Sequence, residues 1–316
     1  MRYSDPLVVE TPRRVLRPHG RTYVVTGAGG GLGDAIARGL LRAGARVMAV
    51  ARDRVRAEEV RGALTSEAPR SRVDVVAADL SVRAEIERGA AEVLERHPEV
   101  HGLFHCAGLR TARRETSSDG HERMFAVEYL APFLLTNRLL EALRASAPTR
   151  VVAVVPHGIG SGPWAARSLN TDNLQGDGSF HPLAHAKHLA LARLLFMREF
   201  GRRTYADGVT PIVVAPGATR TGLNRRLPLH LRLVARALEG MRAPQLPQKA
   251  GHHLMEAVTD PDFEGAQYRY VEEGRETVDV PAARDPNTAR RLWEWTEELL
   301  GERFAAGDSG EAPAAG

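Results

Sequence analysis

A glycine-rich stretch near the start of the chain has the composition of a phosphate-binding turn. The sequence Thr26-Gly27-Ala28-Gly29-Gly30-Gly31-Leu32-Gly33 follows an apolar run at 22–26 and opens a helical pattern at 32–43. Gly27 allows a sharp turn off the strand, Gly31 lets the backbone approach a pyrophosphate, and Gly33 lets the helix pack closely on the sheet. The free N–H groups of the helix N-terminus then face the phosphates. We therefore predict a dinucleotide site that includes Thr26, Gly27, Gly29, Gly31, Leu32 and Gly33.

Charged residues follow the next two apolar runs. Arg52 ends the second run, where a guanidinium can pair with a ribose 2′-phosphate, so we predict NADP(H), with NAD left open. The alternative is an exposed arginine in a loop that also contains Arg54 and Arg56. Asp79 and Leu80 end the third run. There a carboxylate can accept from an adenine amino group or cap a helix, and both interpretations stay open.

These residues need a frame of alternating strands and helices. Short, nearly continuous apolar runs, typical of strands buried on both faces, lie at 22–26, 46–51, 72–77, 102–106, 150–155 and 210–215, and a further short strand is predicted at 267–271. Helical patterns lie at 32–43, 54–65, 81–96, 121–146, 183–203, 223–241, 247–258 and 286–300. This alternation predicts a parallel sheet with helices on both sides. No linker divides the chain, so we predict an N-terminal arm (1–20), one domain (21–302) and a Gly/Ala/Pro-rich tail (303–316).

Composition narrows the function classes. The 316 residues carry a formal net charge of +4, nearly all of the positive charge is arginine, and the arginines are interleaved with acids, which argues against nucleic acid as a partner. No apolar run approaches the roughly 20 residues that span a bilayer, and the N-terminus does not resemble a signal peptide. A single cysteine, Cys106, favours a reducing, cytoplasmic setting. We predict a small-molecule substrate and no metal site.

Further motifs resemble the short-chain dehydrogenase/reductase family, in its retinol-dehydrogenase-like branch. They are the glycine turn, Cys106-Ala107-Gly108 after the fourth run, Phe133-Leu134-Leu135-Thr136-Asn137, and Pro216-Gly217 with Thr219 and Thr221. The resemblance covers about residues 20–302. It implies a doubly wound Rossmann fold with a mostly parallel seven-stranded sheet. It also adds expected cofactor contacts: Cys106, Ala107, Gly108, Lys187, Pro216, Gly217 and Thr219.

Members of the family transfer the proton with a tyrosine, a lysine, a serine and an asparagine. The positions of this sequence that match them hold other residues. Pro156 stands at the position of the serine and Glu128 at that of the asparagine. The Tyr-x-x-x-Lys helix falls in the segment 182–190, where the register is ambiguous; Ala186 and Ala190 fit the following residues best. No tyrosine lies between Tyr129 and Tyr205 in any register. An unassisted phenol is a poor base at neutral pH, and here even the phenol is absent.

Glu128, His157, His185 and His188 are the candidates to replace that chemistry, because the resemblance places them near the mouth of the nicotinamide pocket. A carboxylate beside a histidine can move protons in an isomerisation, dehydration or cyclisation, and this redox-neutral chemistry is the leading hypothesis. A true oxidoreductase with a relocated donor such as His185, and a noncatalytic nucleotide-binding protein, are the alternatives.

The resemblance also implies a lid and a dimer. The segment at about 220–247 corresponds to a lid over the substrate, and its arginines among leucines would also suit a membrane surface. Its apolar residues suggest a bulky apolar substrate. Family members often pair through the helices that correspond to 121–146 and 183–203, so a homodimer is an expected assembly.

Overall fold

The structure is a computed structural model that describes residues 17–162, 165–219, 221–238 and 245–304. Most of the predicted N-terminal arm and of the predicted tail therefore lies outside the described residues. The strands are β1 (Thr22–Thr26), β2 (Arg46–Ala51), β3 (Val73–Ala77), β4 (Gly102–His105), β5 (Thr149–Val154), β6 (Val209–Ala215), β7 (Arg269–Glu272) and β8 (Arg275–Glu276). The α-helices are α1 (Gly31–Arg42), α2 (Arg54–Leu64), α3 (Arg83–Arg96), α4 (Arg123–Phe125), α5 (Ala131–Arg138), α6 (Leu140–Ala145), α7 (Pro182–Thr204), α8 (Leu229–Leu238), α9 (Pro247–Thr259) and α10 (Pro286–Leu300).

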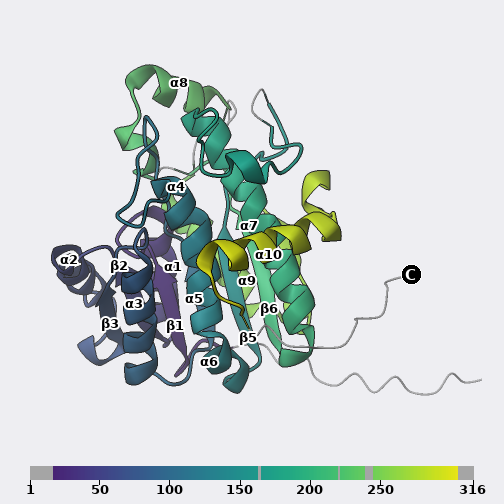
Figure 1. Cartoon of the computed structure of the whole chain (residues 1–316). Coiled ribbons are helices and arrows are strands. Elements are labelled where there is room, and N and C mark those ends of the chain that lie inside the picture. Colours follow the sequence, from purple (N-terminus) through teal and green to yellow (C-terminus); the bar gives the residue numbers. More distant parts are fainter. Residues whose placement is uncertain (1–16, 163–164, 220, 239–244, 305–316) are drawn as a thin grey trace, which may run out of the picture.

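The strands form one sheet in the order β3-β2-β1-β4-β5-β6-β7-β8, with helices on both faces (Figure 1). Every pairing from β3 to β7 is parallel, which confirms the predicted doubly wound fold. The short strand β8 pairs antiparallel with β7 and is an eighth strand beyond the seven expected. It arises because the chain turns back at Glu273-Gly274, and it has only two residues, both exposed, so no apolar pattern marks it.

The strand order reverses between β1 and β4, and this point positions the site. Thr26 at the end of β1 pairs with His105 at the end of β4. In open α/β sheets, ligands bind in the crevice beyond the carboxyl ends of strands at such a switch point. The predicted glycine turn and the Cys106-Ala107-Gly108 segment both leave the sheet there.

Two hydrophobic cores cover the faces of the sheet. One packs α1, α2 and α9 against it, and the larger one contains residues of α3, α5, α7 and α10. The helix predicted at 121–146 is divided into α4, a π-helical turn (Ala126–Leu130), α5 and α6. The π-helical turn contains Glu128, so this interruption sets the direction of a predicted site residue. Among the described residues, no helix is long and apolar enough to cross a membrane.

Candidate functional site

The glycine turn has a backbone shape that larger residues would disrupt. Gly27 has a φ of +69°, and a Cβ there would lie 2.8 Å from backbone atoms of Ala107. A Cβ on Gly33 would lie 2.2 Å from the carbonyl oxygen of Gly27. These contacts bring the start of α1 against the end of β1. Helix α1 begins with Gly30 at its N-cap and no side chain caps it, so its first N–H groups remain available to an anion.

Thr26 fixes the floor of the crevice. Its hydroxyl donates to the carbonyl of Phe104 at 3.1 Å and accepts from the N–H groups of Cys106 and Ala107 at 3.1 and 3.2 Å. The carboxyl ends of β1 and β4 are thereby tied together. Burial raises the pKa of the Cys106 thiol to about 12, so it stays protonated at neutral pH and is a poor nucleophile.

Two arginines flank the glycine turn. Arg52 is exposed, and its Nε lies 3.4 Å from a carboxylate oxygen of Asp53. The guanidinium of Arg56 donates to the carbonyl of Gly29, which places a second cation on the turn. Sequence reasoning treated Arg56 only as part of an arginine-rich loop. Its signal was its position four residues after Arg52, on the first turn of α2.

Asp79 and Leu80 follow the end of β3, as predicted. The Asp79 carboxylate binds a residue of the same turn. Asp79 accepts from the backbone N–H of Ser81 at 2.9 Å and from its hydroxyl at 2.7 Å. The N-cap position of helix α3 is Val82, with no side-chain cap, so Asp79 orders the turn before the helix and does not cap it. Leu80 is buried and lines a small cavity with Thr26, His105, Ala107, Val127, Ala131, Pro132 and Leu135.

The loop after β6 closes on the glycine turn. Gly217 has a φ of +88°, and the Thr219 hydroxyl donates to the Gly217 carbonyl at 3.1 Å. Gln245 donates to the carbonyl of Pro216, so the two ends of the predicted lid segment meet here; residues 220 and 239–244 of that segment lie outside the described residues. A Cβ on Gly31 would lie 2.8 Å from the Thr221 side chain, so Thr221 contacts the turn directly.

Glu128 lies in a buried ion cluster. One carboxylate oxygen accepts from the N–H of Leu109 at 2.9 Å and from the guanidinium of Arg110. The other lies 3.4 Å from the guanidinium of Arg193, and all three charged side chains are buried. The carboxylate is also close to Gly108, where a Cβ would lie 3.5 Å from it. Glu128 thus borders the crevice, but its partners are arginines and not a histidine.

His185 has a different carboxylate partner. Its Nε2 lies 2.9 Å from Oε2 of Glu122, and both side chains are buried. The Glu122 carboxylate also accepts from the N–H groups of Met124 and Phe125, and so caps α4. Sequence reasoning missed Glu122, although a glutamate at the start of a predicted helix is a recognisable cap. The pair joins α7 to α4.

His188 and Lys187 both bind backbone carbonyls of the long connection after β5. His188 Nε2 lies 3.0 Å from the carbonyl oxygen of Asn170, and Lys187 donates to the carbonyl of Ser161 at 2.6 Å. Burial lowers the pKa of each side chain from its ordinary value. These two residues position that connection against α7.

His157 is the predicted histidine with the most accessible ring. Two residues, Val155 and Pro156, separate it from the end of β5, and its side chain is 40% exposed. Its Nδ1 lies 2.8 Å from a carboxylate oxygen of Glu272, the last residue of β7. The pair lies at the carboxyl edge of the sheet, where residues of the candidate site follow the ends of their strands. Glu272 was not predicted, because it approaches His157 only in the folded sheet, where β6 lies between β5 and β7.

Buried alanines, Ala186 and Ala190, stand where the best-fitting register would place the phenol and the ammonium. The phenol of Tyr129 instead contacts the hydroxyl of Thr296 on α10 at 2.6 Å. Tyr205 is exposed at the far end of α7.

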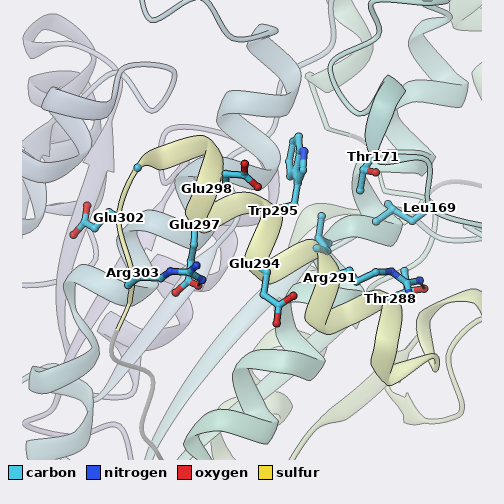
Figure 2. A pocket seen from close by; sticks show the side chains of 12 residues that line it. Leu169, Thr171, Thr288, Arg291, Glu294, Trp295, Glu297, Glu298, Glu302 and Arg303 are labelled. Atoms are coloured by element: carbon cyan, nitrogen blue, oxygen red, sulfur yellow. Dashed lines mark hydrogen bonds and ion pairs between the residues drawn. The ribbon is translucent and has the colours of Figure 1, made fainter.

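A further hollow of the described surface lies away from this crevice. Its volume is about 1020 Å³, and Figure 2 shows its lining side chains projecting mainly from α10. Those labelled are Leu169, Thr171, Thr288, Arg291, Glu294, Trp295, Glu297, Glu298, Glu302 and Arg303. None of the predicted cofactor or catalytic residues belongs to this lining.

Comparison with known proteins identifies the family. Residues 21–165 match the family model for short chain dehydrogenase. The chain is 34% identical over 296 residues to retinol dehydrogenase 14 of Mus musculus, covering 90% of this chain and 86% of the relative. It is 33% identical to polyprenol dehydrogenase of Mus musculus, covering 93% and 88%. The chain belongs to the short-chain dehydrogenase/reductase family. Within it, these relatives place the chain in the retinol-dehydrogenase-like branch, among oxidoreductases.

Solved structures share this fold. An uncharacterized protein from Mycobacterium paratuberculosis superposes with a TM-score of 0.68 at 26% identity, covering 92% of this chain and 97% of the other. The Pseudomonas aeruginosa RhlG/NADP complex has a TM-score of 0.62 at 22% identity, covering 84% and 97%, and shows the same fold.

Proposed function

We propose that this chain is an NADP(H)-dependent oxidoreductase of apolar alcohols or carbonyl compounds, in which His157 replaces the family's tyrosine as proton donor. The fit of the cofactor rests on the crevice itself. The uncapped N-terminus of α1 and the close backbone contacts at Gly27 and Gly33 suit a pyrophosphate. Arg52 and Arg56 supply the positive charge that a ribose 2′-phosphate requires.

The proposed proton transfer rests on the contact between His157 and Glu272. NADPH, when bound, supplies a hydride to the carbonyl carbon. The imidazole supplies the proton to the carbonyl oxygen, so that an alcohol forms and the cofactor is oxidised. Glu272 contacts Nδ1 and so fixes the orientation of the ring, which leaves Nε2 as the donor to the substrate. Solvent contact then lets the imidazole recover its proton.

The redox-neutral hypothesis has less support from the contacts of Glu128. It required this carboxylate to act beside a histidine. The two carboxylate oxygens of Glu128 instead contact the guanidinium groups of Arg110 and Arg193. His185 and His188 are engaged with Glu122 and with a backbone carbonyl.

The substrate class follows from the relatives and from the lid. The two relatives are named for the apolar alcohols retinol and polyprenol. In this chain, Leu223 of the lid segment packs over Gly108 at the edge of the crevice. An apolar wall at this place favours an apolar substrate.

A cofactor-consumption assay tests the proposal. NADPH absorbance is followed with a panel of apolar aldehydes that includes all-trans-retinal, using wild type, His157→Ala and His188→Asn. We expect turnover that falls 10²- to 10⁴-fold in His157→Ala, because the variant loses its general acid. His188→Asn, which alters the contact with the backbone carbonyl of Asn170, should retain most activity. Aldehyde conversion without loss of NADPH would support the redox-neutral alternative, and equal rates in wild type and His157→Ala would exclude His157 as the donor.

A further inference from the structure

Helix α8 carries large apolar side chains on its surface. It lies at one end of the molecule, beyond the main helix layers (Figure 1). Leu229 is 67% exposed and Leu233, one turn later, is 55% exposed, with Val234 beside them. We call these three residues the apolar lid face. Together with Leu246, they make up four of the seven large exposed hydrophobic residues in the described part of the chain. Exposed apolar surface is therefore concentrated on one segment.

The same segment has a charge pattern unlike the rest of the sequence. Residues 217–238 contain five arginines and no aspartate or glutamate. Elsewhere arginines pair repeatedly with carboxylates, as in the contacts of Arg38 with Asp34 and Glu67. Within the described residues, Arg225 contacts only the backbone of Gly222, and no carboxylate is paired with Arg225 or Arg232. In the described part of this segment, the apolar lid face is thus accompanied by Arg225 and Arg232, for which no carboxylate partner is present.

We infer that the apolar lid face docks on an anionic phospholipid surface. Such a surface satisfies both features at once, because acyl chains receive the leucines and headgroups neutralise the arginines. A lid that only covers an apolar substrate would use the leucines but would gain nothing from the arginines. A second copy of this chain across a two-fold axis would bring the same arginines together, which is repulsive. This inference is independent of the proposed hydride chemistry.

Vesicle co-sedimentation tests the inference. Full-length protein is mixed with vesicles of phosphatidylcholine alone or of phosphatidylcholine with phosphatidylglycerol. We expect binding to the anionic vesicles that weakens as salt rises, and little binding to the neutral ones. The variant Arg225→Gln/Arg232→Gln should lose about 25-fold in partitioning, at about fivefold for each arginine. The variant Leu229→Glu/Leu233→Glu should lose about 100-fold or more.

Val55→Glu is the matched control, because Val55 is 73% exposed on α2, outside the lid. It should bind anionic vesicles within about twofold of wild type. Circular dichroism and NADPH titration check that each variant remains folded. The inference is overturned if wild type ignores the anionic vesicles, or if Leu229→Glu/Leu233→Glu binds them as wild type does. It is equally overturned if the leucine variant instead abolishes a concentration-dependent dimer seen without lipid.

Discussion

At the scale of single residues, the clearest feature is one carboxylate enclosed by two guanidinium groups. Glu128 is the sole acid that compensates Arg110 and Arg193 within this cluster of the described core. Glu128→Gln removes its charge while keeping its size, so two buried cations lose their partner. We expect the free energy of unfolding to fall by about 3–5 kcal/mol. Urea denaturation measures this loss.

Glu141→Gln is the comparison for that experiment. Glu141 forms an ion pair with Arg144, but its side chain is 83% exposed. The change should therefore cost less than about 1 kcal/mol. If Glu128→Gln were as stable as wild type, the buried cluster would not have the structural role assigned to it.

His105 gives the molecule a defined sensitivity to acid. Its Nε2 lies 2.8 Å from the Thr136 hydroxyl, and burial together with the charge of Arg193 lowers its pKa to about 3. The unfolded chain binds a proton at this histidine below about pH 6.5, and the native state does not until about pH 3. Stability from this group is therefore complete above pH 6.5 and is lost as the pH falls towards 3.

The acid sensitivity has a direct test. Between pH 7 and pH 5 the unfolding free energy should fall by about 2 kcal/mol more in wild type than in His105→Gln. Urea denaturation at the two pH values measures the difference. Equal losses in both proteins would show that His105 accepts protons in the native state.

At the scale of elements, the sequence predicted what depends on local pattern. Strands buried on both faces are continuous apolar runs, so β1 to β7 were found within a few residues. The glycine turn was predictable because its conformation is specific to glycine. The break in the helix at 121–146 was not, because the π-helical turn contains Glu128, whose partners Leu109, Arg110 and Arg193 lie on other segments and leave no local signal. The pairs His157–Glu272 and His185–Glu122 likewise join residues 115 and 63 positions apart, beyond any local signal.

The junction of β1 and α1 carries a prediction of its own. Gly33→Ala places a Cβ 2.2 Å from the Gly27 carbonyl, so the helix must move from the strand. We expect NADPH affinity to fall at least tenfold, because the phosphate-binding N–H groups are displaced. Fluorescence titration measures the affinity. Gly62→Ala is the control: it lies inside α2 with open space around it and should stabilise the protein by about 0.5–1 kcal/mol. Wild-type affinity in Gly33→Ala would contradict the predicted binding turn.

At the scale of the whole molecule, the C-terminal helix covers a surface that was expected to form a dimer. Helix α10 packs on α7, and buried Trp293 contacts Phe133 of α5 and Phe196 of α7, with ring centroids 4.7 and 6.0 Å away. A homodimer through the faces under α10 would have to displace it. We therefore expect any self-association to use a surface other than these faces and the apolar lid face, so light scattering should give the same mass for the full chain and for Leu229→Glu/Leu233→Glu.

Trp293 is the centre of this packing. Trp293→Ala should lower the free energy of unfolding by about 3–5 kcal/mol, because the vacated volume cannot be refilled by rigid neighbours. Trp295→Ala, on the same helix but only partly buried, should cost clearly less. Thermal or urea denaturation compares the two. Similar losses would mean that α10 is not anchored through Trp293.

We propose that the crevice between β1 and β4 binds NADP(H), although α7 contains no tyrosine. Fluorescence titration of the purified chain with NADPH and with NADH tests it most directly. We predict that NADPH binds at least about tenfold more tightly, and that Arg52→Ala/Arg56→Ala removes most of this preference because the 2′-phosphate loses its cations. If wild type bound neither nucleotide, the crevice would not be a dinucleotide site. Equal affinity for both nucleotides would exclude the proposed preference for NADPH.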